Sequence, residues 1–80
     1  FNALTTITYR IPKPSNVDII VYDSRGKIVK NILRDTQISG RYSVNWDGKN
    51  NNGIAVSSGI YFYEIQTQYT HQKRKMLLLK

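Results

Sequence analysis

Short stretches in which apolar and polar residues alternate recur along the whole chain. The first stretch, residues 5–11, places Ile7, Tyr9 and Ile11 on one side and polar residues on the other. Alternation with a period of two residues is typical of a β-strand with one buried face, and no segment has the apolar spacing of an amphipathic helix. The pattern therefore predicts an all-β protein.

Turn residues divide the chain into the strands that this pattern predicts. Pro12 and Pro14 end the first strand, because proline cannot donate a hydrogen bond to a sheet. Glycines mark later corners, among them Gly26, where a hairpin turn with a positive φ is expected. The expected strands cover residues 5–11, 17–23, 27–33, 41–46, 54–56, 60–68 and 73–79.

Two of these strands depart from simple alternation. In the second strand, Ile20 and Tyr22 add apolar surface to the face opposite the core. Apolar residues on both faces are typical of a central strand that is partly covered on both sides. In the third strand, the apolar residues come in adjacent pairs, which predicts a β-bulge or a mid-strand bend near Lys30 and Asn31.

About seven short strands joined by polar turns predict one small antiparallel, immunoglobulin-like β-sandwich over residues 1–80. Eighty residues suffice for a single domain, and a chain without cysteine has no disulfide to support its core. The core must therefore depend on apolar packing and backbone hydrogen bonds. The side chains expected in it are Ile7, Tyr9, Ile11, Val17, Ile19, Val21, Tyr42, Val44, Trp46, Tyr61, Tyr63 and Ile65.

The charge is strongly positive, with 12 basic and 5 acidic side chains and a net charge of +7. Such a charge attracts anionic partners, although lysines on strand edges also discourage aggregation. The one basic cluster, Lys73-Arg74-Lys75, lies away from the alternating aromatic residues, so no stacking platform for nucleic acid is expected. The longest apolar run, Met76–Leu79, is much shorter than the roughly 20 residues of a membrane span.

Little in the sequence indicates catalysis or metal binding. The loop Asp47–Gly53 is rich in oxygen atoms. However, Lys49, Asn52 and Ser58 occupy positions where a calcium loop needs a ligand, a glycine and an acid. A wide turn is therefore favoured over a calcium site. His71 has cationic neighbours and no acid nearby in the sequence, so it is expected to be a surface residue. We expect no catalytic residue, cofactor or metal.

Aromatic residues gather within residues 60–65, where they could form either part of the core or a sugar-binding face. Alternating aromatics in a strand are more often core residues, so Tyr61 and Tyr63 are assigned to the core. Phe62 shares a face with Glu64. Of the aromatic residues in this segment, we therefore expect Phe62 to be the one exposed and available to a partner.

Four blocks of the sequence occur in a distinctive order and spacing. They are Phe1-Asn2 with residues 5–9, residues 17–29, residues 40–63 around Trp46-Asp47-Gly48, and Lys73–Lys80. In these blocks the chain resembles the immunoglobulin-like domain of the flagellar hook-capping family and the similar C-terminal sorting domain of the bacterial type IX secretion system. One departure is Ala3-Leu4, which stands where that family usually has Pro-Ser.

The resemblance implies a non-catalytic C-terminal module of a larger bacterial protein, exported through the periplasm and outer membrane to the cell surface or the extracellular space. The start at Phe1, without a signal peptide, fits a part of a larger protein. The implied partners are the proteins of the secretion and sorting machinery and the adjoining domain of the parent. Residues expected to matter for recognition are Gly59, Tyr61, Lys75 and Lys80, to which we add Phe62, Lys73 and Arg74.

Two other functions remain open. A structural or carbohydrate-binding accessory module beside a catalytic domain would use the Phe62 face and the basic tail. Its further candidate partner is an anionic cell-surface polysaccharide. A hook-cap-like assembly domain would instead bind hook subunits. Gly59 and Tyr61 could serve the fold in any of these functions.

Overall fold

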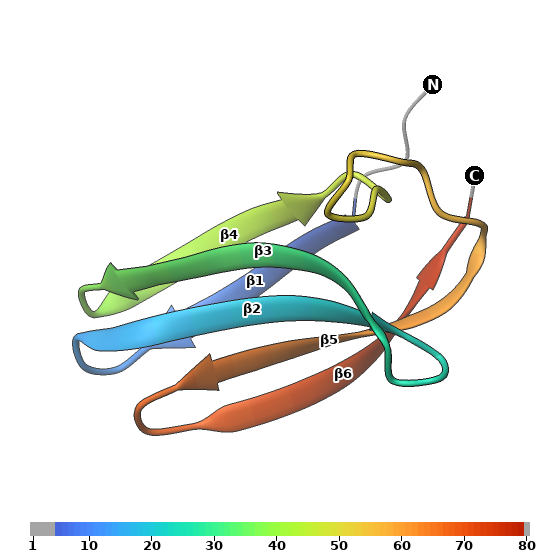
Figure 1. Cartoon of the computed structure of the whole chain (residues 1–80). Helices are drawn as coiled ribbons and strands as arrows, with labels where there is room; N and C mark the ends of the chain where they lie inside the picture. The colour runs from blue at the N-terminus through green and yellow to red at the C-terminus, as the bar shows by residue number, and fades with distance from the viewer. Residues whose placement is uncertain (1–4, 80) are drawn as a thin grey trace.

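Six strands form two antiparallel sheets in the computed structural model, which describes residues 5–79 (Figure 1). No helix within these residues is long and apolar enough to cross a membrane. The strands are β1 (Thr5–Ile11), β2 (Ser15–Asp23), β3 (Ile28–Gln37), β4 (Gly40–Trp46), β5 (Gly59–Thr67) and β6 (His71–Leu78). The smaller sheet pairs β1 with β4, and the larger has the order β3-β2-β5-β6.

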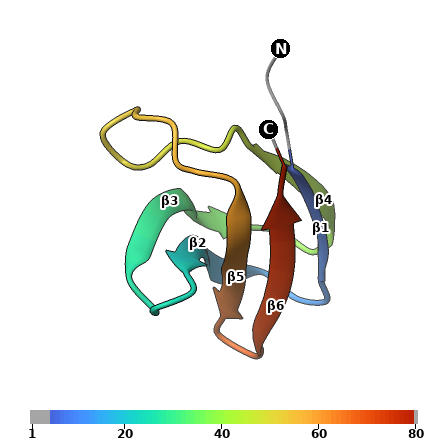
Figure 2. The same cartoon turned by 90° about the vertical axis from the view of Figure 1, so that its right-hand side faces the viewer.

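The two sheets meet over two clusters of buried apolar side chains, and Figure 2 shows the sandwich from one end. The first cluster joins three residues of β1 to three of the larger sheet: Ile7, Tyr9, Ile11, Val17, Ile19 and Ile65. The second contains Val21, Val29, Trp46, Tyr61 and Leu78. Complete burial of one such large side chain contributes about 1.5–3 kcal/mol, so these clusters hold the sheets together.

The expected immunoglobulin-like β-sandwich is confirmed, but the core differs in detail. Tyr42, Val44 and Tyr63 are half-buried and pack against the first cluster rather than lying inside it. For Tyr63 of β5 the reason is that the smaller sheet, with only two strands, covers part of the larger one. Val29 and Leu78 belong to the core although the alternation did not single them out.

The count of about seven strands is corrected to six within residues 5–79, because residues 54–56 form no strand. Their only ladder contact is an isolated bridge between Lys49 and Ala55. Two backbone bonds form this bridge, from the Val56 N–H to the Gly48 carbonyl and from the Asn50 N–H to the Ile54 carbonyl. Residues 54–56 therefore bond back to their own loop rather than to a neighbouring strand.

The bulge expected near Lys30 and Asn31 is confirmed as two irregularities that flank this pair. The β2–β3 register skips Ile32 on one side and Val29 on the other. Each extra residue is apolar, and both pack into the core. The bulges thus let adjacent apolar residues of β3 reach the core: Val29 does so beside the outward-facing Ile28, and Ile32 and Leu33 both do so.

Candidate interaction surface

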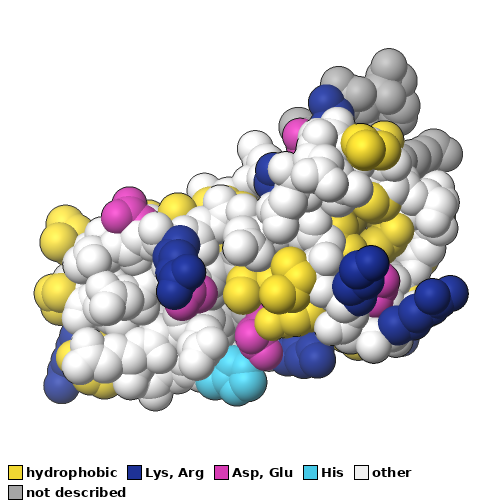
Figure 3. All heavy atoms as spheres, in the orientation of Figure 1, with side chains coloured by type: hydrophobic (Ala, Val, Ile, Leu, Met, Phe, Trp, Pro, Cys, Tyr) yellow, Lys and Arg dark blue, Asp and Glu magenta, His cyan; other side chains and the backbone are white. Residues whose placement is uncertain are grey.

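A row of apolar side chains crosses the outer face of the larger sheet, the face that points away from β1 and β4. The strand register places Ile28, Tyr22 and Phe62 beside one another. Two residues before Phe62 on the same face of β5, it pairs Ile60 with Leu77. Ile28, Ile60 and Leu77 are 49%, 46% and 59% exposed. We call these five residues the apolar row. Figure 3 shows hydrophobic side chains gathered over the middle of this face.

The outer face of β2 is less covered than its sequence predicts. Ile20 and Tyr22 are half-buried, but among residues 5–79 no strand lies over them, since all six strands belong to the two sheets. Their burial comes from neighbours within the same sheet. Tyr22 and Ile28 were missed as surface residues because only strand pairing brings them to Phe62. The sequence feature that could have identified this surface was the presence of apolar residues on both faces of β2.

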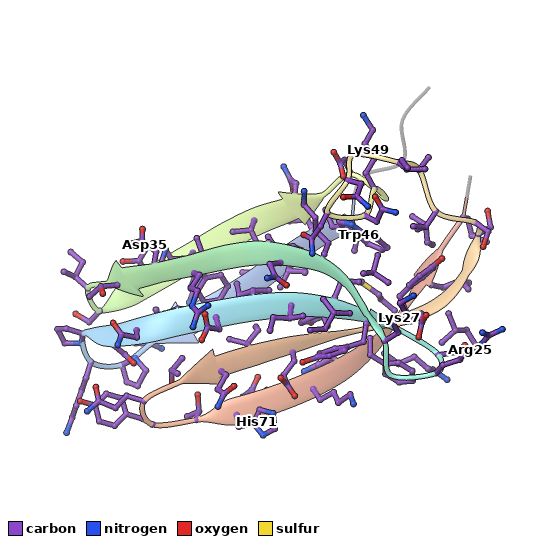
Figure 4. All side chains as sticks on the ribbon, in the orientation of Figure 1. Arg25, Lys27, Asp35, Trp46, Lys49 and His71 are labelled. Carbon is purple, nitrogen blue, oxygen red and sulfur yellow. The ribbon has the colours of Figure 1, made fainter. Side chains whose placement is uncertain are left out.

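Glu64 lies beside the apolar row and connects the polar side chains around it. Its Oε2 lies 2.6 Å from His71 Nε2, and the Tyr22 hydroxyl donates to its Oε1 at 3.2 Å. Lys73 faces Glu64 in the register, with its Nζ 5.4 Å from the Tyr22 ring centroid and 5.7 Å from that of Phe62. These separations are typical of cation–π contacts. Figure 4 shows His71 on β6, at the margin of this face.

The electrostatics of this group favour an ionised Glu64. The hydrogen bond from His71 is the main cause that lowers the Glu64 pKa; Tyr22 adds to it and burial opposes it. Burial, followed by the hydrogen bond to Glu64, raises the Tyr22 pKa. A carboxylate held ionised in this way is a poor proton shuttle near neutral pH. The arrangement therefore suits binding rather than acid–base chemistry.

The structure brings three of the expected recognition residues together on the outer face. Phe62 lies opposite Lys75 in the β5–β6 register, and the Lys73 ammonium group lies over the Phe62 ring. Within residues 60–65, Phe62 and Tyr63 are half-buried and Tyr61 is buried. Tyr22 is the register neighbour of Phe62 on β2, and the Lys73 ammonium group lies 5.7 Å from the Phe62 ring centroid.

The other expected recognition residues lie elsewhere. Arg74 pairs with Tyr63 and therefore belongs to the inner face of β6. Gly59 begins β5 opposite Leu78, with a φ of 156°. Lys80 lies outside the described residues, as do Phe1-Asn2 and Ala3-Leu4.

Tyr61 is buried and helps to fix the loop between β4 and β5. Its ring packs edge-on against Trp46 with centroids 5.2 Å apart, and its hydroxyl donates to the Ser57 carbonyl at 2.7 Å. The Trp46 indole N–H donates to the Lys49 carbonyl at 2.9 Å, and Figure 4 labels both residues at this end of the molecule. In this structure Tyr61 contributes to packing of the fold.

The loop Asp47–Gly53 forms the wide turn that its sequence predicts. The Asn50 side-chain oxygen accepts hydrogen bonds from the backbone N–H groups of Asn52 and Ile54. Asp47 accepts one from the N–H of Lys49. These oxygens serve the turn itself, and residues 5–79 contain no group of three acidic or histidine side chains placed to hold a metal ion.

A solved structure shares this arrangement of strands. It is the crystal structure of FlgD from P. aeruginosa, with a TM-score of 0.73 and 28% sequence identity. The match covers 94% of this chain and 58% of that one, so the chain spans little more than half of the FlgD structure. No curated protein matches the chain.

A family model gives the more direct assignment. The model described as the FlgD Ig-like domain matches residues 2–71. The match ends before Lys73, so it leaves out the terminal block on which the sorting interpretation depends. The chain belongs to the FlgD Ig-like domain family, and its domain is a structural, non-catalytic one.

Proposed function

We propose that the chain is an assembly domain of the hook-cap kind, which holds protein subunits together and does not act on a substrate. The match to the FlgD Ig-like domain over residues 2–71 is the observation that carries this proposal. The hook-cap role was the alternative hypothesis from the sequence, and the family match favours it over sorting by a type IX system. An adjoining domain of a parent protein and export from the cell are part of the same proposal.

The apolar row is the surface that we propose for contact with a subunit. Protein interfaces commonly combine aromatic and aliphatic residues at the centre with polar residues at the rim. Phe62 and Tyr22 would form such a centre, with Glu64, Lys73 and Lys75 around them. The Glu64 contacts restrain the surrounding side chains. These side chains would therefore lose less conformational entropy when a partner binds.

The test measures binding of the chain to purified hook subunits of the same organism by isothermal titration calorimetry. We expect binding that weakens about tenfold or more when Ile60 and Leu77 are both replaced by serine, because central apolar contacts carry most of an interface's energy. The matched control replaces Ile38 and Ile54 by serine. These two are 73% and 62% exposed but lie outside the apolar row.

Equal binding by both double variants would exclude the apolar row as the contact, and no binding by the unmodified chain would overturn the hook-cap role. Sorting is tested separately by fusing residues 1–80 to a reporter in a bacterium with a type IX system. Delivery of that reporter to the cell surface would favour the sorting interpretation. Binding to a glycan array that is lost in Phe62→Ala would favour the carbohydrate-binding module.

A further inference from the structure

An open groove runs along one side of the sandwich, between the edge of β1 and the strands β5 and β6. Its volume is about 340 Å³, and its lining includes Thr8 and Arg10 of β1, Arg41 of β4, Ile65 of β5 and Gln72 of β6. Figure 2 shows β1 and β6 as neighbours with no strand drawn between them. The groove lies on the opposite side of the larger sheet from the apolar row.

The groove follows from the unequal widths of the two sheets. A sheet of two strands faces a sheet of four, so part of the inner surface of β5 and β6 has no strand opposite it. Ile65 is buried there and Tyr63 is half-buried, whereas Gln72 and Arg74 on the same inner surface of β6 are exposed. One further strand beside β1 would cover this surface.

The edge of β1 is open to such a strand. β1 pairs with β4 on one side over seven consecutive residues without a bulge, and among residues 5–79 it has no partner on its other side. Exposed edges are usually blunted by charged side chains, especially lysine, by proline or by bulges. The β3 edge has two bulges and the β6 edge carries Lys73 and Lys75, whereas residues 5–11 contain no lysine, proline or bulge and a single charged side chain, Arg10.

The charged side chains that line the groove are both arginines. Arg10 and Arg41 lie directly opposite each other in the β1–β4 register, and both side chains are exposed. Like charges in this position destabilise a sheet. None of the residues that line the groove is acidic, and the ion pairs of residues 5–79 are Arg34–Asp18 and His71–Glu64, both elsewhere. An anionic side chain placed over the two arginines would relieve their repulsion.

We propose that an extended, acidic segment of a partner protein adds to the free edge of β1 and lies in this groove. Backbone hydrogen bonds to β1 supply affinity in this mode of binding, and alternate side chains supply specificity. Side chains on one face of the segment lie over Ile65 and Gln72, where apolar residues fit. Those on the other face lie beside Arg10 and Arg41, where glutamate or aspartate fits.

This proposal rests on the proposed assembly function in one respect, namely that the partner is a protein. It uses a different surface from the apolar row. If the double variant Ile60→Ser with Leu77→Ser loses hook-subunit binding, the proposal for the groove still stands. If no peptide binds in the groove, the proposed contact through the apolar row still stands.

The probe is a capped heptapeptide of alternating glutamate and valine, with a lysine–valine peptide as its control. Nuclear magnetic resonance of the isotope-labelled chain would measure both affinity and backbone hydrogen exchange. We expect the acidic peptide to slow exchange of the outward-facing N–H groups of β1 about tenfold or more, because a paired edge exchanges only when it opens. The lysine peptide is expected to leave exchange unchanged.

Two charge-matched double variants then test the arginines. Arg10→Glu with Arg41→Glu is expected to weaken acidic-peptide binding about tenfold or more, since reversed charges at the contact repel the peptide. Arg25→Glu with Arg34→Glu changes the net charge equally but lies outside the groove, and it should bind as the unmodified chain does.

Several results would overturn the proposal. Equal weakening by the two double variants would mean that only net charge matters. Slowed exchange in β6 rather than β1 would place the peptide on the wrong edge. Slowed exchange in β1 at high protein concentration without peptide would make a second copy the occupant. Tight binding of dextran sulfate, with no change in β1 exchange and no peptide binding, would indicate an anionic polysaccharide instead.

Discussion

Glu64 organises the outer face through both hydrogen bonding and charge. Its two carboxylate oxygens contact two different partners, His71 on β6 and Tyr22 on β2, so one side chain of β5 connects three strands. Lys73 adds a positive charge near the same carboxylate. Loss of the Glu64 charge should therefore loosen several side chains beside the apolar row.

The first prediction concerns the pH dependence of stability. Because the Glu64 pKa is lower in the folded chain than in the unfolded one, the stabilisation is present above the unfolded pKa of 4.5. It is lost as the pH falls through the folded pKa. We expect Glu64→Gln to lower the free energy of unfolding by about 1 kcal/mol at pH 7, a modest value because solvent screens the exposed His71.

Urea unfolding measures the free energy of unfolding at pH 7 and at pH 3. This free energy should fall less between pH 7 and pH 3 in Glu64→Gln than in the unmodified chain. Two partner variants serve as controls. His71→Ala should reduce the pH dependence more than Tyr22→Phe, because the His71 hydrogen bond is the larger cause of the lowered Glu64 pKa. The reverse order would contradict this assignment.

At the scale of elements, the β2–β3 hairpin depends on its turn. The Asp23 carboxylate accepts hydrogen bonds from the N–H groups of Arg25 and Lys27, both at 2.9 Å. These backbone hydrogen bonds, chiefly the one from Lys27, lower the Asp23 pKa. Gly26 completes the turn with a φ of 87°, a conformation that side-chain-bearing residues rarely adopt.

The second prediction separates backbone strain from crowding at Gly26. A Cβ added there meets nothing within 4 Å, so the cost of Gly26→Ala arises from φ alone. We expect it to lower the free energy of unfolding by about 1–2 kcal/mol. Gly26→Asn should cost less, because asparagine tolerates this conformation better. Thermal unfolding measures both, with Ser24→Ala as the control, and equal losses for alanine and asparagine would refute the argument from φ.

The sequence allowed the strands to be predicted better than their partners. Alternation reports which side of a strand is buried, and it located β1 and β4 almost to the residue. It could not show that residues 54–56 bond within their own loop, since three apolar residues fit a strand or a loop equally well. It also could not bring Arg10 to Arg41, because only the β1–β4 register creates that pair.

The candidate site shows the same division between local and distant information. The Phe62 and Lys73–Lys75 assignments came from local features, an aromatic residue on a polar face and a basic run. Their meeting with Tyr22 depends on β2 lying next to β5, a pairing between segments some 40 residues apart. Such distant pairings carry no periodic signal along the chain.

At the scale of the whole molecule, the two core clusters are physically continuous. Ile32 and Tyr63 each pack against both clusters, and β2 and β5 contribute buried residues to both. Because neither cluster can lose its packing without disturbing the shared strands, the molecule should unfold as one unit. Small domains of this size usually do so.

The third prediction tests this continuity with the single tryptophan. Trp46 is 1% exposed and reports on the second cluster, whereas far-ultraviolet circular dichroism reports on all strands. We expect both signals to unfold at one midpoint. Ile7→Val, in the first cluster, should lower both midpoints together by about 4–8 °C for a loss of about 1 kcal/mol. A Trp46 midpoint that stays in place while the circular dichroism midpoint falls would show that the clusters unfold separately. Ile54→Val changes the same side chain at an exposed loop position and should leave both midpoints unchanged.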